Sequence, residues 1–127
     1  MKNIEALKLI NRIQKDINDN GINAEALAEQ LMELRKFSLE EKYPRMTKVL
    51  RLSAEHLNEH GDFLIAIPAD EPVEEIDGEA VVSHLEAEPL VTGGESLDYM
   101  LSLMTDPTNK TNHTELGEYR DQLLDMQ

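Results

Sequence analysis

The sequence contains no cysteine and no tryptophan, and aromatic residues make up only 4% of its 127 residues. The absence of cysteine excludes disulfide bonds, thiolate nucleophiles and cysteine-based zinc sites, and it is typical of proteins in a reducing compartment. The scarcity of aromatic residues argues against binding of single-stranded nucleic acid, which stacks its bases on aromatic side chains. The carboxylates, histidines and hydroxyl groups therefore remain as the candidates for chemistry.

Basic residues are absent between Arg51 and Lys110. Residues 1–60 hold ten Lys/Arg and ten Asp/Glu, whereas residues 61–127 hold two Lys/Arg against sixteen Asp/Glu, so the second stretch accounts for the whole formal net charge of −14. A field of one sign repels nucleic acid and anionic membranes and attracts basic surfaces. The charge distribution therefore predicts a protein partner with a basic surface, and neither a nucleic-acid partner nor a membrane partner.

Long hydrophobic runs are also absent. No apolar stretch approaches the about 18 residues of a membrane-spanning helix, and the first residues form no apolar signal-peptide segment. We therefore expect a soluble, cytoplasmic protein. A chain of this length fits one domain, residues 1–127, that buries roughly two-thirds of its unfolded surface.

Apolar residues spaced by three and four predict two N-terminal helices that pair as an antiparallel hairpin. The first ends at Asn20-Gly21, a favourable C-cap, and the second begins after Asn23 as N-cap. The expected apolar faces are Ile4, Leu7, Ile10, Ile13 and Ile17 in the first helix and Leu27, Leu31 and Leu34 in the second.

The start of the third helix has two alternatives. Ser38 and Glu41 have the spacing of a capping box, which would begin the helix there and leave Pro44 to kink it. In the other alternative the second helix continues to about Lys42 and the third begins at Pro44. Gly61 ends the third helix in both.

The second half of the chain predicts an irregular connection followed by two helices. Residues 63–67 are an apolar run before Pro68 and are consistent with a strand or extended segment. A short helix is expected to contain Leu97 to Met104, after a loop at residues 92–95. A final helix is expected from Asn112, with Glu115 completing its cap.

Together these patterns predict an all-α, or mostly α, bundle of about five helices with room for one short strand pair. We divide it into a charge-neutral helical subregion (1–61), an acidic connection (62–94) and a C-terminal helical pair (95–127).

The string His56-Leu57-Asn58-Glu59-His60 matches the pattern of inverted zinc proteases. On a helix, His56 and His60 share a face and could ligate one Zn²⁺ ion, with Glu59 as base. The string lies in the last helical turn, however, where histidine is favoured by the macrodipole, and such an enzyme needs a third ligand. We therefore predict a structural role, with no metal site, no cofactor and no catalytic residue.

The acidic connection is the predicted partner-binding segment, because it mixes carboxylates with apolar residues that could anchor a partner. It lacks the spacing of an EF-hand calcium loop. The candidate residues are Asp70, Glu71, Glu74, Glu75, Asp77 and Glu79. The sequence thus favours a non-enzymatic protein-interaction module that engages a basic partner. The alternatives are a homo-oligomerising structural protein, such as a homodimer, and a zinc-dependent hydrolase that uses His56, Glu59 and His60.

Overall fold

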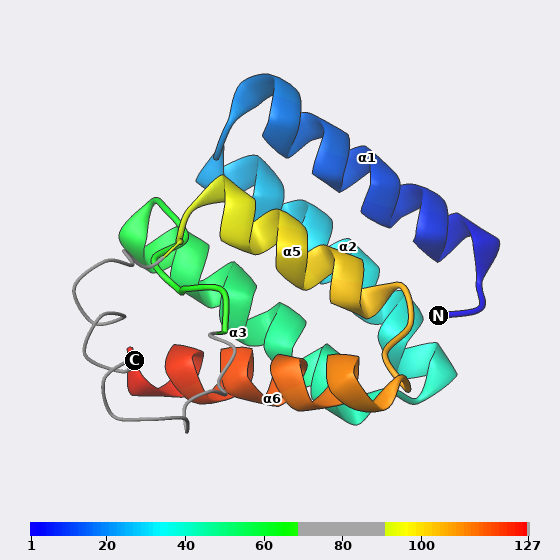
Figure 1. Ribbon diagram of the computed structural model, residues 1–127. Coiled ribbons are helices and arrows are strands. Elements are labelled where there is room, and N and C mark those ends of the chain that lie inside the picture. The colour runs from blue at the N-terminus through cyan, green and yellow to red at the C-terminus, as the bar shows by residue number, and fades with distance from the viewer. Residues whose placement is uncertain (69–90, 127) are drawn as a thin grey trace, which may run out of the picture.

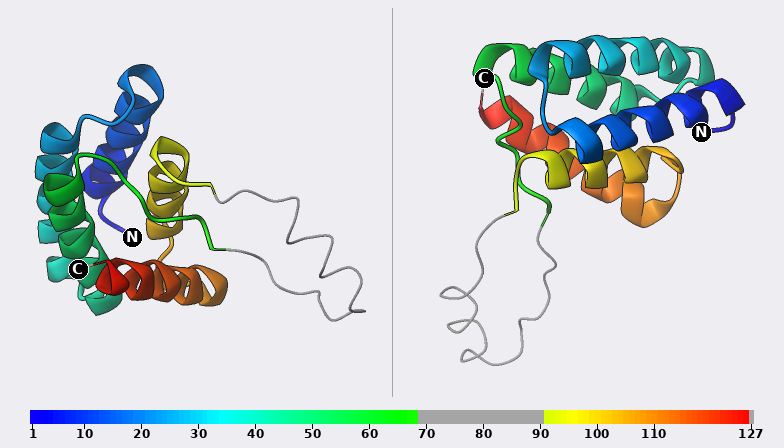
Figure 2. Two further views of the ribbon diagram at one scale, coloured as in Figure 1. Left: turned by 90° about the vertical axis from the view of Figure 1, so that its left-hand side faces the viewer. Right: turned by 90° about the horizontal axis from the view of Figure 1, so that it is seen from above.

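A computed structural model describes residues 1–68 and 91–126 of the chain. These residues form helices and no strand, which confirms the predicted all-α bundle of five helices. The helices are α1 (Ile4–Asn20), α2 (Ala24–Glu41), α3 (Pro44–His60), α5 (Gly94–Met104) and α6 (Lys110–Asp125). They contact one another in a closed order, α1 to α2, α2 to α3, α3 to α6, α6 to α5 and α5 back to α1 (Figures 1 and 2). None of the described helices is long and apolar enough to cross a membrane.

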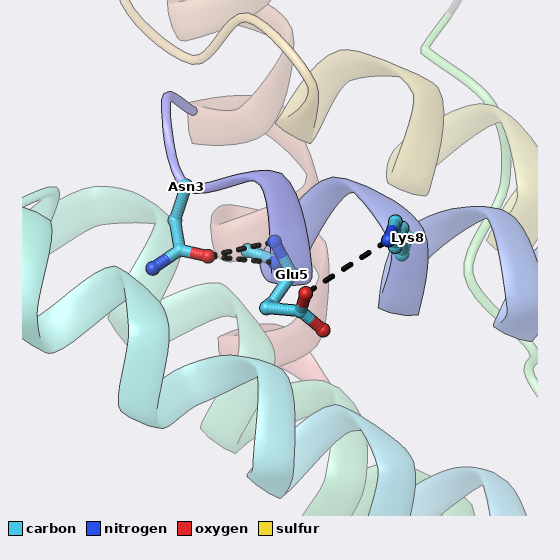
Figure 3. Close-up of polar contacts among 4 residues, drawn as sticks. Asn3, Glu5 and Lys8 are labelled. Carbon is cyan, nitrogen blue, oxygen red and sulfur yellow. Dashed lines mark hydrogen bonds and ion pairs between the residues drawn. The ribbon is translucent and has the colours of Figure 1, made fainter.

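Helix α1 ends where the sequence predicts, and Asn3 caps its start. The Asn3 side chain accepts hydrogen bonds from the backbone N–H groups of Glu5, at 2.8 Å, and Ala6, at 3.2 Å (Figure 3). Gly21 follows the helix with a φ of 74°, and its N–H donates to the Ile17 carbonyl. A positive φ is readily available to glycine, so Gly21 ends the helix with little strain.

The boundary between α2 and α3 settles the two alternatives in favour of a helix that starts at Pro44. Helix α2 continues to Glu41, Lys42 adopts a left-handed conformation with φ 64°, and Pro44 is the first residue of α3. A proline at this position removes an N–H that has no intrahelical partner anyway. The capping-box alternative at Ser38 is wrong: Ser38 is fully buried within α2, and its hydroxyl lies 2.7 Å from that of Thr47 on α3.

Residues 63–67 form an extended segment that passes beside α6 and holds the two described parts of the chain together. The Gly93 N–H donates to the Phe63 carbonyl at 2.8 Å, and the Ile67 N–H donates to the Val91 carbonyl at 2.9 Å. The Gln122 side chain of α6 both accepts from the Ala66 N–H and donates to the Ala66 carbonyl. The Gln122 amide therefore satisfies the Ala66 backbone groups that a neighbouring strand would satisfy in a sheet. No strand is present among the described residues.

Helix α6 begins earlier than the sequence predicts. Its N-cap is Asn109, whose side chain accepts from the Asn112 N–H at 3.1 Å. Asn112 lies in the first turn and donates its side-chain N–H to the Asp106 carbonyl. Both asparagines suit an N-cap, so spacing alone did not distinguish them. Helix α5 begins after Gly93, with no side-chain cap.

The core lies inside the closed order of helices. Phe63 and Tyr119 are fully buried with ring centroids 6.4 Å apart. The Tyr119 hydroxyl donates to the Ser96 carbonyl and lies 3.0 Å from the Ser96 hydroxyl, so these buried polar groups satisfy one another. Burial raises the pKa of Tyr119 well above its usual value, so its phenol stays neutral.

Candidate functional site

The predicted partner-binding residues lie outside the described residues. They are Asp70, Glu71, Glu74, Glu75, Asp77 and Glu79. The described residues nevertheless contain two surface hollows of opposite charge, one on α2 and one where the α2–α3 turn meets α6.

The first hollow, which we call the acidic hollow, has a volume of about 570 Å³ along α2. Glu25, Glu29 and Glu33 line it at helical spacings of four, so their side chains follow one stripe of the helix. Met32 lies in the same hollow with 39% of its surface exposed. The hollow therefore offers carboxylates beside an apolar side chain.

These three carboxylates form no ion pair among the described residues and repel one another. Lys36 lines the end of the hollow, yet within residues 1–68 and 91–126 no Lys, Arg or His forms an ion pair with Glu25, Glu29 or Glu33. Like charges spaced by four destabilise a helix by about 0.2–0.5 kcal/mol per pair. A cationic ligand that bridges the stripe would relieve this repulsion.

The second hollow, the basic cavity, has a volume of about 660 Å³ between the start of α3 and α6. Its apolar walls include Tyr43, Met46 and Leu116, and His113 also contributes. Its cationic lining consists of Lys42, Arg45, Lys48 and Arg120. No carboxylate lines it.

A smaller hollow of about 420 Å³ adjoins the basic cavity and shares Lys42 and Lys48 with it. The smaller hollow adds Arg35 and Arg51. The basic cavity and the smaller hollow are therefore lined by six of the chain's twelve Lys/Arg residues. The Arg35 Nε atom is buried and has no hydrogen-bond partner. A positive surface thus occurs in a protein whose formal net charge is −14.

The His56 ring supports the fold. His56 is only 4% exposed, and its Nε2 atom accepts a hydrogen bond from the Leu64 N–H at 3.0 Å. Burial lowers the pKa of His56, and the neighbouring His60 lowers it further. The ring is therefore neutral near pH 7, with its proton on Nδ1. The Nε2 lone pair that could bind a metal is already used to position the extended segment.

The other members of the string do not complete a metal centre. The His60 ring lies 4.5 Å from the His56 ring between centroids, and its Nε2 atom is 3.7 Å from the Glu59 carboxylate. In the part of the chain that the structure describes, no three His, Cys, Asp or Glu residues gather as metal ligands do. Within the string, His56 thus has a structural role, because its ring accepts the Leu64 N–H.

Sequence reasoning missed both hollows, although each has a signal in the sequence. Three glutamates spaced by four mark the acidic hollow, and five of the six Lys/Arg residues within residues 35–51 line the basic surface. The contribution of Arg120 from α6 depends on the tertiary fold.

Comparisons with protein families, curated proteins and solved structures find no match for this chain.

Proposed function

We propose that this protein is a non-enzymatic interaction module that binds a basic protein partner. The observation that carries the proposal is the acidic hollow, in which Glu25, Glu29 and Glu33 have no cationic partner among the described residues and lie beside the exposed Met32. Carboxylates steer a basic partner toward the surface, and an apolar contact supplies affinity once water is excluded.

The acidic connection adds to this attraction. Residues 70–79 hold six of the carboxylates that give residues 61–127 their charge. Their field acts over roughly 8 Å at physiological salt, so it favours approach of a basic surface and repels an acidic one. The partner is thus bound by a surface that includes the acidic hollow, with the connection as a second contact.

The proposal is tested by capture from a lysate of the source cells with three variants and the native protein. One variant changes Glu25, Glu29 and Glu33 to Gln, and a second changes the connection residues Glu71, Glu74, Glu75 and Glu79 to Gln. We expect the first variant to lose a basic partner that the native protein retains. Calorimetry of the identified partner should then show affinity that falls steeply with added salt.

The third variant, Glu40→Gln with Glu95→Gln and Asp125→Asn, is the matched control for the acidic hollow. It also removes three negative charges, but from exposed positions outside the acidic hollow. It should therefore retain the partner if the hollow binds the partner locally. If both triple variants lost the partner equally, binding would depend on net charge alone. That result would contradict a defined binding surface.

Two alternatives have their own tests. A homo-oligomer would bury exposed apolar residues such as Ile4 and Leu39 against a second copy, and a strictly monomeric mass at micromolar concentration would contradict it. A zinc-dependent hydrolase would have to release His56 Nε2 from Leu64. Native mass spectrometry after zinc supplementation would reveal a bound ion.

A further inference from the structure

Three of the four Lys/Arg residues that line the basic cavity form no ion pair among the described residues. Within the described ranges, Lys42, Arg45 and Lys48 form no ion pair, whereas Arg51 pairs with Glu55 and Arg120 pairs with Asp121. Screening limits the influence of distant acids to about a Debye length, roughly 8 Å at physiological salt. A small anion inside the cavity therefore experiences its cationic lining more strongly than the net charge of the molecule.

Arg45 contacts α6 through its guanidinium. Its Nη1 atom donates to the His113 carbonyl at 2.9 Å, and its guanidinium lies against the backbone at Gly117. A Cβ atom at Gly117 would approach Nη1 to 2.8 Å, so only glycine allows this contact without displacement. Glycine within a helix is less favourable than alanine. The arginine thus lies at the cavity wall, with N–H donors left for a ligand.

The start of α3 adds to the positive potential of the cavity. Pro44, Arg45 and Met46 line the wall, Tyr43 provides no side-chain cap, and the first turn contains no acidic residue. The first backbone hydrogen bond of the helix runs from the Thr47 N–H to the Tyr43 carbonyl, so the preceding N–H groups have no helical partner.

The shape of the cavity favours a small ligand with an apolar part. Its volume of about 660 Å³ lies within the usual range for small-molecule sites, and Tyr43, Met46 and Leu116 form apolar walls beside the cations. A long polyanion would extend from the cavity over the acidic remainder of the surface and be repelled there. A compact anion avoids that repulsion.

We propose that the basic cavity binds a small organic phosphate, with its phosphate group near Lys42, Arg45 and Lys48 and its apolar part against Tyr43 and Leu116. Guanidinium and ammonium groups suit the phosphate oxygens, the guanidinium through paired donors. This site is independent of the acidic hollow on α2 and of the proposed basic partner.

Isothermal titration calorimetry of the full chain tests the proposal with phenyl phosphate, inorganic phosphate and phenol as probes. We expect phenyl phosphate to bind at least about tenfold more tightly than either of the other two, because only it contacts both the cations and the apolar walls. Absence of binding by phenyl phosphate, or equal affinity for inorganic phosphate, would overturn the proposal. Tighter binding of duplex DNA than of phenyl phosphate would overturn the small-ligand assignment.

Variants locate the ligand. Lys42→Gln with Lys48→Gln should weaken phenyl phosphate binding at least about tenfold. Lys8→Gln with Lys15→Gln changes the net charge equally on α1 and should leave the affinity within about twofold. Equal weakening by both pairs would overturn a local site.

Gly117→Ala examines Arg45 separately. Alanine has a higher helix propensity than glycine, and its Cβ would contact Nη1 at the end of the flexible Arg45 side chain. The thermal midpoint should therefore be maintained while the Arg45 guanidinium is displaced. Weaker phenyl phosphate binding with an unchanged midpoint supports the site. Unchanged binding would overturn the assignment of Arg45 to it.

Discussion

At the scale of single residues, His56 connects protonation to stability. Its ring is buried against His60 and Phe63, accepts the Leu64 N–H, and has Glu59 and Asp62 as the nearby acids. The pKa of His56 is lowered in the folded state, so the unfolded chain binds the proton more tightly. The contribution of His56 to the free energy of unfolding is therefore fully present above its ordinary pKa of about 6.5 and is lost as the pH falls toward the lower folded value.

We predict that the free energy of unfolding decreases from pH 7 to pH 5, and that His56→Gln reduces this decrease. Glutamine can still accept the Leu64 N–H but does not titrate in this range. Urea denaturation at several pH values measures both slopes. Identical slopes for the native protein and the variant would show that His56 is not the titrating group.

At the scale of helices, the N-cap of α1 provides a local prediction. Asn3→Ala removes an acceptor from the N–H groups of Glu5 and Ala6, so the free energy of unfolding should fall by about 0.5–2 kcal/mol. Lys8→Ala is the control on the same helix, because its ion pair with Glu5 is 3.9 Å long and exposed, and it should change stability by less than about 0.5 kcal/mol. Chemical denaturation compares the two; equal effects would contradict the role of Asn3 as a cap.

The sequence predicted the helices where caps and periodicity agree, and erred where two signals competed. Gly21 and Gly61 lie at the predicted helix ends, where glycine readily adopts the positive φ that follows each helix. Ser38 has the type and spacing of a cap, but burial against Thr47 places it inside α2. Local patterns therefore predicted the elements better than their exact limits.

The candidate sites depended more on tertiary structure. The acidic stripe of α2 is visible as spacing, whereas the basic cavity requires Arg120 and Gly117 of α6 to meet Arg45 of α3. A contact between residues so far apart in the sequence has no periodic signal. The packing of α3 on α6 brings these residues together.

At the scale of the whole molecule, contacts among the described residues join residues 1–68 to residues 91–126. Hydrogen bonds between Phe63 and Gly93 and between Ile67 and Val91 bring the chain on either side of this segment together. The core residues of the described ranges include side chains from every helix and from the extended segment. A linker of about three residues from Pro68 to Val91 would give a loop of ordinary hairpin length.

We predict that replacing residues 69–90 with Gly-Ser-Gly preserves the fold, because the hydrogen bond between Ile67 and Val91 brings the flanking residues within reach of a short linker. Circular dichroism and urea denaturation check this prediction, and loss of helical signal would contradict it. The replacement removes eight acidic residues and no Lys or Arg, so the formal net charge changes from −14 to −6. Retention of the basic partner by this variant would assign binding to the acidic hollow on α2, whereas loss of the partner from a folded variant would assign it to the acidic connection.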